Sequence, residues 1–197
     1  VLAEESGPQE GSEYTWVIDP LDGTTNFLHG FPMFAVSVAA MRNGILEHGV
    51  VYDPLRDEMF TASRGEGAQL NGKRLRVSST RQLTPALLGT GFPFRDLSIM
   101  EPWMRSFQSL VPKTAGIRRA GAAALDLAYV AAGRLDGFWE FGLKPWDMAA
   151  GALLIREAGG LVSDVSGDQG FIESGNLVTA NPHIFEDLRK IVARSGL

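Results

Sequence analysis

Two carboxylates lie three residues apart in the run WVIDPLDGTTNF, which spans residues 16–27. Asp19 and Asp22 follow a stretch of aromatic and β-branched residues, and the small, hydroxyl-rich turn 23–25 comes directly after them. Carboxylate oxygens are ligands that Mg²⁺ prefers, and backbone N–H groups at the start of a helix can bind phosphate. The run therefore predicts a site for a divalent cation and a phosphate group. A plain turn with solvated acids is the alternative, because Asp-Pro and Asp-Gly are common turn pairs.

Acidic residues in two other parts of the chain could join this site. Glu4 and Glu5 lie upstream, and Asp147 lies far downstream, at the start of a predicted helix over 146–158. Taken alone, the two glutamates fit solvated charges near a chain end, and Asp147 fits a helix cap. Capping and metal binding are compatible, because the positive end of a helix favours the ionised carboxylate that a metal needs.

Two further segments contain candidate ligand contacts. Gly121, Ala122 and Ala123 precede a predicted helix, where their small size fits close packing. Glu140 ends a predicted aromatic strand. Its carboxylate could accept a hydrogen bond from a polyol hydroxyl or could pair with Lys144 at the rim of a site.

The composition excludes several classes of function. The chain has 197 residues, of which 45% are hydrophobic, so it can bury a sizeable core as one domain or one closely joined pair of layers. A net charge of -5 with scattered Lys and Arg argues against a nucleic-acid footprint. The absence of cysteine excludes disulfides, thiolate nucleophiles and cysteine-ligated metals, which leaves carboxylates as the main metal ligands. No apolar run is long enough to cross a bilayer and the first residues show no secretory pattern, so we expect a cytoplasmic protein without membrane contact.

Hydrophobic periodicity and turn signals predict a sheet-rich first half and an alternating second half. In residues 1–115 we expect a loop over 5–12, strands over 14–18, 34–41, 46–52, 58–63, 67–77 and 86–90, and a helix over 99–111. Pro20 is expected to end the first strand, and Asn43-Gly44 to turn a hairpin. In residues 116–197 we expect strands over 116–119, 136–140, 161–164 and 177–180, and helices over 122–132, 146–158 and 182–193. Sheets covered by helices make an α+β or mixed α/β fold in a single unit over residues 1–197.

These elements together resemble the inositol monophosphatase family, within the wider group of Mg²⁺-dependent, lithium-sensitive phosphatases of sugars and nucleotides. The resemblance covers essentially the whole chain and implies a layered αβαβα sandwich whose N-terminal helical segment is missing here. It also implies a homodimer. The segments that carry it are Glu4-Glu5-Ser6, the run 16–27, Arg118-Arg119-Ala120-Gly121, Trp139-Glu140-Phe141-Gly142, Trp146-Asp147-Met148-Ala149-Ala150-Gly151 and Glu157-Ala158-Gly159-Gly160.

The resemblance implies a role for each candidate residue. Two or three Mg²⁺ ions are expected, with Li⁺ as an inhibitor. Glu4 and Thr24 would orient the attacking water, which displaces the alcohol in line. The implied metal ligands are Glu4, Asp19, the Leu21 carbonyl, Asp22 and Asp147. The implied substrate contacts are Leu21, Asp22, Gly23, Thr24, Gly121, Ala122, Ala123, Glu140 and Asp147. Family members often have Thr or Ser at the position of Ala122, so one hydroxyl contact is absent in this chain.

The expected function is hydrolysis of myo-inositol 1-phosphate and related polyol phosphates. Residues Thr25-Asn26-Phe27 are similar to the inositol monophosphatase branch rather than to its nucleotide or histidinol-phosphate relatives. Hydrolysis of fructose 1,6-bisphosphate is an alternative, because this motif does not measure the size of the pocket. A second alternative is a protein-binding role in transcription elongation or antitermination, which bacterial relatives also suggest. A third is that the acids bind Mg²⁺ only for stability.

Overall fold

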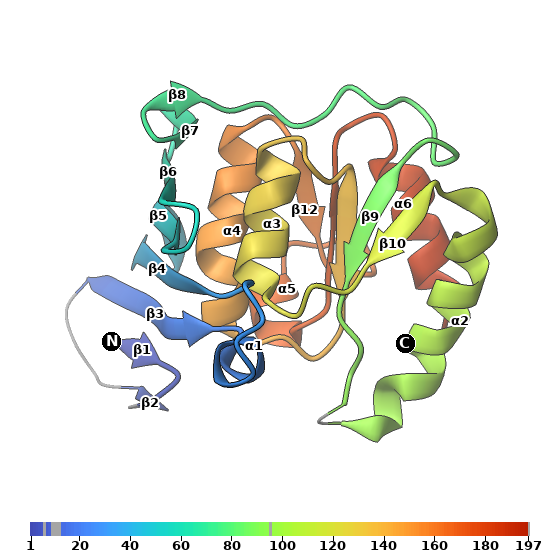
Figure 1. The fold of residues 1–197 in the computed structure, drawn as a ribbon, viewed down its shortest axis with the longest axis horizontal. Helices are drawn as coiled ribbons and strands as arrows, with labels where there is room; N and C mark the ends of the chain where they lie inside the picture. Colours follow the sequence, from blue (N-terminus) through green and yellow to red (C-terminus); the bar gives the residue numbers. More distant parts are fainter. Residues whose placement is uncertain (6, 9–12, 95, 197) are drawn as a thin grey trace.

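The structure, a computed structural model, describes residues 1–5, 7–8, 13–94 and 96–196. The described residues form two β-sheets and six α-helices. Figure 1 shows them, from left to right, as four layers: the first sheet, two helices, the second sheet and two further helices. This arrangement confirms the predicted mixed α+β class, and it gives four of the five layers that the resemblance implies.

The first sheet has eight strands in the order β2-β1-β3-β4-β5-β6-β7-β8. Neighbouring strands are antiparallel, except that β1 runs parallel to β3. Asn43 and Gly44 turn between β4 and β5 with φ angles of 49° and 78°, so the predicted hairpin is confirmed. The strands are β1 (Leu2–Ala3), β2 (Gly7–Pro8), β3 (Tyr14–Asp22), β4 (Ala35–Arg42), β5 (Ile45–Asp53), β6 (Glu58–Ser63), β7 (Gly67–Leu70) and β8 (Lys73–Arg74).

The second sheet has five strands in the order β10-β9-β11-β13-β12. Strand β9 is parallel to β10 and β11, whereas β13 is antiparallel to β11 and β12. Because β9 and β11 run in the same direction, the residues that follow them emerge at the same edge of the sheet. The strands are β9 (Leu87–Thr90), β10 (Gly116–Arg118), β11 (Gly137–Glu140), β12 (Leu161–Ser163) and β13 (Leu177–Ala180).

Helices of two kinds cover these sheets. The helices α3 and α4 lie between the sheets and are buried almost all round, while α2 and α6 cover the outer face of the second sheet and bury one side only (Figure 1). The helical segments are α1 (Thr24–Leu28), α2 (Met100–Leu110), α3 (Ala123–Ala131), α4 (Pro145–Glu157), α5 (Phe171–Ser174), α6 (Phe185–Ala193) and the 3₁₀ helices η1 (Leu97–Ile99) and η2 (Val111–Lys113).

Helix α4 packs on three neighbours: the first sheet, α3 and β12 of the second sheet. All of its residues 148–155 are buried. A Cβ at Gly49 of β5 would lie only 3.1 Å from the backbone of Ala150, and a Cβ at Gly151 would lie 2.5 Å from Leu127 of α3. Glycine at these positions therefore lets the backbones approach closely. The first turn of α4 is thereby held in a fixed position between the two sheets.

Strand β3 corrects the prediction that Pro20 ends it. The strand continues to Asp22, with Asp19 opposite Ser37 and Asp22 opposite Ala35. Three steps along β3 thus match two steps along β4, which means that one extra residue forms a β-bulge. A bulge leaves a residue outside the hydrogen-bond ladder, and this is where a strand tolerates proline, which has no N–H to donate.

The remaining differences concern short elements. The predicted loop over 5–12 contains β2, which pairs with β1 through Gly7 and Pro8, so this part of the prediction was wrong; residues 6 and 9–12 lie outside the described residues. The four-residue helix α5 is too short to produce a periodic pattern. Within the described residues, no helix combines the length and apolar character needed to cross a bilayer. The assignment of residues 1–197 to a single unit stays a prediction.

Candidate active site

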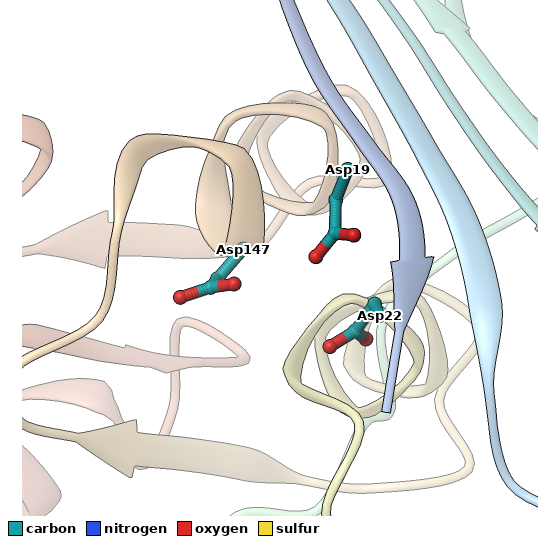
Figure 2. Close-up of side chains that lie close together, drawn as sticks. All are labelled: Asp19, Asp22 and Asp147. Carbon is teal, nitrogen blue, oxygen red and sulfur yellow. The ribbon is translucent and has the colours of Figure 1, made fainter. Parts of the chain in front are cut away.

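Asp19, Asp22 and Asp147 lie together although 125 residues separate the last two in the sequence. One carboxylate oxygen from each lies within 4.8 Å of the corresponding oxygens of the other two. Figure 2 shows that β3 supplies Asp19 and Asp22 and that the first turn of α4 supplies Asp147, with the three side chains around a shared space. We call these three residues the acidic trio.

The β-bulge explains why both aspartates of β3 belong to the trio. In a regular strand, side chains three positions apart point to opposite faces of the sheet. The extra residue between Asp19 and Asp22 restores the same facing, and both side chains are buried, with exposed fractions of 2% and 7%. The irregular pairing at Pro20 is therefore the feature that assembles this half of the site.

Each carboxylate of the trio accepts one backbone hydrogen bond. These bonds orient the side chains and leave further oxygen lone pairs for a ligand. They also link the site to the starts of α3 and α4, because the donors lie there or in the bulge. The three bonds run from Leu21 N to Asp19 Oδ1 (2.9 Å), from Ala124 N to Asp22 Oδ2 (2.9 Å) and from Lys144 N to Asp147 Oδ2 (2.7 Å). Asp147 is thus a helix cap and a member of the trio, as the sequence allowed.

Glu4 lies beside the trio because β1 runs parallel to β3. Ala3 lies opposite Ile18 and the Glu4 amide donates to the Ile18 carbonyl (3.3 Å), which brings Glu4 level with Asp19. A side-chain hydrogen bond joins the Glu4 and Asp19 carboxyl groups. Glu5 is exposed, and Glu4 is the upstream glutamate that lines the cleft described below.

The acids of the trio raise one another's pKa. Burial, followed by the nearby charges of Glu4 and Asp147, raises the pKa of Asp19 from 3.8 to about 7. Burial and the charges of Asp147 and Asp19 raise the pKa of Asp22 well above 3.8. Both carboxylates are costly to ionise together without a positive partner, so this arrangement favours binding of a cation.

A turn directly after β3 adds polar groups next to the trio. Gly23 has a positive φ of 85° and precedes α1, and the Thr24 hydroxyl donates to the Leu21 carbonyl (2.9 Å). Because the hydroxyl hydrogen of Thr24 is used in this bond, its oxygen can accept a hydrogen bond from a further molecule. The sequence predicted this turn and its helix start.

A cleft of about 350 Å³ opens over the trio and contains every candidate residue that the sequence singled out. Its floor includes Gly121, Ala122 and Ala123, of which the two alanines are buried, so these residues both pack closely and line the cleft. The candidates that line it are Glu4, Asp19, Leu21, Asp22, Gly23, Thr24, Gly121, Ala122, Ala123, Glu140 and Asp147.

Glu140 lies at the end of β11, with its carboxylate against the backbone of Gly91, the residue that follows the parallel strand β9. Burial, followed by the charges of Asp126 and Asp147, raises the pKa of Glu140 from 4.5 to about 8. The ion pairs of the described residues do not include Glu140 with Lys144. Of the two alternatives for Glu140, the geometry therefore favours contact with a ligand in the cleft.

Sequence reasoning missed the aromatic wall of the cleft. Phe92 and Phe94 follow β9 and line the cleft, and the Arg119 guanidinium lies over the Phe92 ring at 4.2 Å from its centroid. Phe92 also packs edge-on against Trp103 of α2. The sequence does show aromatic residues directly after a predicted strand, but the parallel pairing of β9 with β11 was needed to place them at this edge.

The trio fits a divalent cation such as Mg²⁺. All its ligand atoms are carboxylate oxygens, and two oxygens at opposite sides of one Mg²⁺ lie about 4.2 Å apart, twice the Mg–O distance of about 2.1 Å. The observed separations of up to 4.8 Å are close to this value, so small side-chain movements would suffice to bind an ion. The raised pKa values of Asp19 and Asp22 agree with a site that needs a positive charge.

The layered fold with its acidic cleft is typical of metal-dependent phosphatases, and the chain belongs to the inositol monophosphatase family, which it matches over residues 1–196. It is similar to the protein named Nus factor SuhB of Pseudomonas aeruginosa, with 62% identity over 194 residues that cover 95% of this chain and 72% of that protein.

Two solved structures agree over almost the whole chain. The crystal structure of the extragenic suppressor protein suhB from Bartonella henselae has a TM-score of 0.94 and 47% identity, and it covers 100% of this chain and 76% of that one. The structure of inositol monophosphatase from Anabaena (Nostoc) has a TM-score of 0.92 and 43% identity, with 98% and 77% covered. These likenesses confirm the fold and the family that the motifs indicated.

Proposed function

We propose that this chain is a Mg²⁺-dependent phosphomonoesterase that hydrolyses myo-inositol 1-phosphate and related polyol phosphates. The observation that carries the proposal is the acidic trio, three carboxylates with oxygens within 4.8 Å, at the base of a cleft of about 350 Å³. Membership of a family of metal-dependent phosphatases supports the same reaction class.

Residues at the base of the cleft would bind the phosphate and the attacking water. The trio, with Glu4 and the Leu21 carbonyl, would hold two or three Mg²⁺ ions, which when bound stabilise negative charge on the phosphoryl oxygens and on the leaving oxygen. The backbone amides of Gly23 and Thr24 would donate to the phosphate. Glu4 and the Thr24 hydroxyl oxygen would accept hydrogen bonds from the water and orient its lone pair toward phosphorus.

Residues at the other wall would contact the polyol. The backbone of residues 121–123 and the carboxyl groups of Glu140 and Asp147 are placed to meet ring hydroxyls in the cleft. With a pKa of about 8, Glu140 can donate a hydrogen bond when protonated and accept one when ionised, which suits a hydroxyl partner. Ala122 supplies no hydroxyl, and Li⁺ is expected to inhibit by competing for a Mg²⁺ position.

A phosphate-release assay tests this proposal. The purified protein is given myo-inositol 1-phosphate, fructose 1,6-bisphosphate and a nucleotide monophosphate, each with and without Mg²⁺ and Li⁺. We expect Mg²⁺-dependent release that is highest with the inositol ester and inhibited by Li⁺. A higher rate with fructose 1,6-bisphosphate would assign the chain to the alternative substrate.

Charge-neutral variants test the trio itself. Asp22→Asn and Asp147→Asn should each lower kcat by about 1,000-fold, since metal stabilisation of the transition state is worth several kcal/mol and each ~1.4 kcal/mol is tenfold. Asp164→Asn, at an acid outside the cleft, is the matched control and should keep full activity. Full hydrolysis in both trio variants would contradict the assignment of these residues.

We propose a role in the transcription machinery as a second candidate function, because the relative from Pseudomonas aeruginosa is named a Nus factor. Binding to purified RNA polymerase elongation complexes should then survive in the Asp22→Asn variant, because a scaffold does not need the metals. Loss of binding in this variant, or none in the unsubstituted protein, would argue against an independent binding role. We also propose, from the resemblance, that the protein is a cytoplasmic homodimer.

A further inference from the structure

Asn26 connects two segments of the cleft that lie far apart in the sequence. From α1, its side-chain amide nitrogen donates to the carbonyl oxygens of Met33 (2.7 Å), Ala120 (2.9 Å) and Gly121 (3.2 Å). Two of these acceptors lie 94 and 95 residues downstream. A single side chain therefore holds α1, the loop that follows it and the segment before α3 together.

The two segments have different roles in the proposed function. Asn26 is two residues after Thr24 and belongs to the helix that opens with the phosphate-binding turn. Gly121 begins the backbone stretch that would meet the polyol. The clamp thus joins the part of the cleft that would bind phosphate to the part that would bind the rest of the substrate.

The contact between these segments is tight. A Cβ at Gly121 would lie 3.3 Å from the Asn26 amide nitrogen, and one at Gly23 would lie 3.2 Å from the Cβ of Ala122. An amide NH₂ has two hydrogens, so it satisfies three carbonyls by sharing one between two acceptors. Asn26 is half-buried, so water has limited access to replace it as the donor.

We propose that Asn26 is a positioning residue that sets the spacing between the phosphate-binding turn and the polyol-binding backbone. This inference rests on the proposed function. A polyol phosphate must reach both parts at once, whereas a simple phosphate ester needs only the first. Misplacement of about 1 Å can cost a factor of about 100 in rate, so loss of the clamp should act selectively on polyol phosphates.

Two variants with two substrates test the proposal. Asn26→Ala removes the amide, and Asn26→Asp keeps the shape but presents acceptor oxygens to three carbonyls. For each variant, kcat and KM are measured with myo-inositol 1-phosphate and with p-nitrophenyl phosphate, which has no polyol. We expect kcat/KM for the inositol ester to fall about 10- to 100-fold more than kcat/KM for the aryl ester.

Asn181→Ala is the matched control. The Asn181 side chain also clamps distant segments, donating to Ser78 Oγ (2.9 Å) and the Thr80 carbonyl (3.0 Å), but it does not line the cleft. This variant should leave the ratio of the two substrates unchanged, even if it lowers the melting temperature as much as Asn26→Ala does. A general structural effect would therefore appear in both variants, and a positioning effect in only one.

The outcomes separate this inference from the function on which it rests. If the unsubstituted protein hydrolyses no inositol ester, the proposed function fails. If it does, an equal fall for both substrates in the Asn26 variants would overturn the positioning role. Unfolding of both Asn26 variants while Asn181→Ala stays folded would also overturn it, because Asn26 would then serve stability alone.

Discussion

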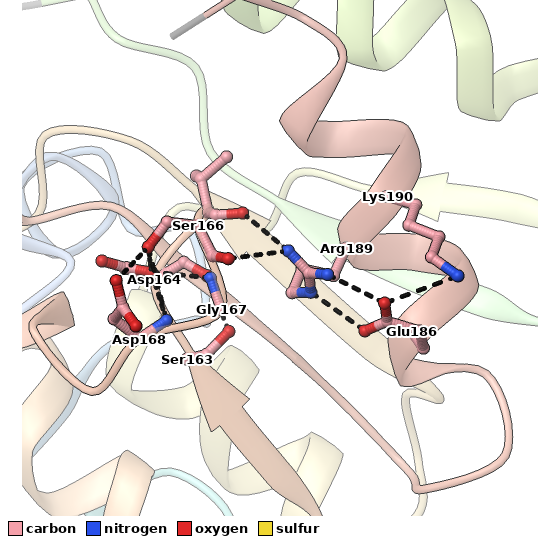
Figure 3. Close-up of polar contacts among 9 residues, drawn as sticks. Ser163, Asp164, Ser166, Gly167, Asp168, Glu186, Arg189 and Lys190 are labelled. Carbon is pink, nitrogen blue, oxygen red and sulfur yellow. Dashed lines mark hydrogen bonds and ion pairs between the residues drawn. The ribbon is translucent and has the colours of Figure 1, made fainter.

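Two groups of acids in this molecule show opposite electrostatics. The acidic trio in the cleft consists of carboxylates that face one another, and the pKa values of Asp19 and Asp22 are raised. The second group, which we call the surface acidic loop, comprises residues 164–168 with Glu186 and Arg189 of α6 (Figure 3). Here burial raises the pKa of Asp164, but hydrogen bonds from the loop outweigh it and hold the pKa below 3.8.

The difference lies in the donors. Asp164 Oδ1 accepts bonds from Ser166 Oγ (2.6 Å) and from the amides of Gly167 and Asp168 (both 2.9 Å). Arg189 also donates to the Ser166 carbonyl (3.0 Å), and Figure 3 shows how this ties the loop to α6. The surface acidic loop is therefore neutralised from within, whereas the trio requires charge from outside. Acidic residues near one another do not by themselves indicate a metal site; their donors decide.

Mg²⁺ should stabilise the protein through the trio alone. At a concentration of about 100 times Kd, binding adds about 2.7 kcal/mol to the free energy of unfolding, which corresponds to a rise in Tm of about 5–10 °C for a chain of this size. Asp22→Asn should abolish this rise, and Asp164→Asn should keep it. Differential scanning calorimetry with and without Mg²⁺ measures the effect. An equal rise in both variants would mean that the cation binds elsewhere.

The metal-free protein should lose stability as pH rises. The pKa of Asp19 is raised from 3.8 to about 7 and that of Glu140 from 4.5 to about 8, so the folded state binds more protons than the unfolded state between about pH 4 and 8. We expect the free energy of unfolding to fall on the order of 2 kcal/mol from about pH 5 to 8 in urea titrations with a chelator.

Mg²⁺ and the surface acidic loop provide the contrasts for this pH experiment. Added Mg²⁺ should remove most of the fall, because it stabilises the ionised carboxylates. Asp164 has a lowered pKa, so its contribution is present at neutral pH and is lost only as pH falls below about 4. A metal-free stability that is constant or rises between pH 5 and 8 would contradict the electrostatics of the cleft.

The smallest effect is expected in the surface acidic loop. Asp164→Ala removes one acceptor of three hydrogen bonds and should lower the free energy of unfolding by about 1–2 kcal/mol, without any change in phosphate release. Asp164→Asn keeps an acceptor oxygen and should lose less than Asp164→Ala. Urea denaturation and the phosphate assay measure both quantities. A loss of activity in either variant would show that this loop contributes to the site after all.

The local motifs allowed much of the fold and of the candidate site to be predicted. The hairpin at Asn43-Gly44, most longer elements and the grouping of Asp19 with Asp22 follow from short-range patterns of turn residues, periodicity and charge. The approach of Asp147 required the resemblance, because no local pattern states which distant segments meet. The structure brings these residues together, while their roles in the reaction stay a prediction.

Other features depend on long-range pairing and could not be read from the sequence. Pro20 suggests the end of a strand, and only the register against β4 shows that it lies in a bulge. Asn26 looks like an ordinary residue of the motif, because its acceptors at Ala120 and Gly121 are about half the chain away. Phe92 joins the cleft through the parallel pairing of β9 with β11.

The enclosure of α4 has a consequence for motion in the cleft. Since this helix packs against both sheets and α3, and since its backbone approaches Gly49 closely, Asp147 cannot shift without disturbing a close-packed interior. Any opening and closing during a catalytic cycle must therefore come from the opposite rim, where Phe94 and Leu97 are 56% and 70% exposed. The chain thus combines a rigid anvil for chemistry with a pliable margin for substrate entry.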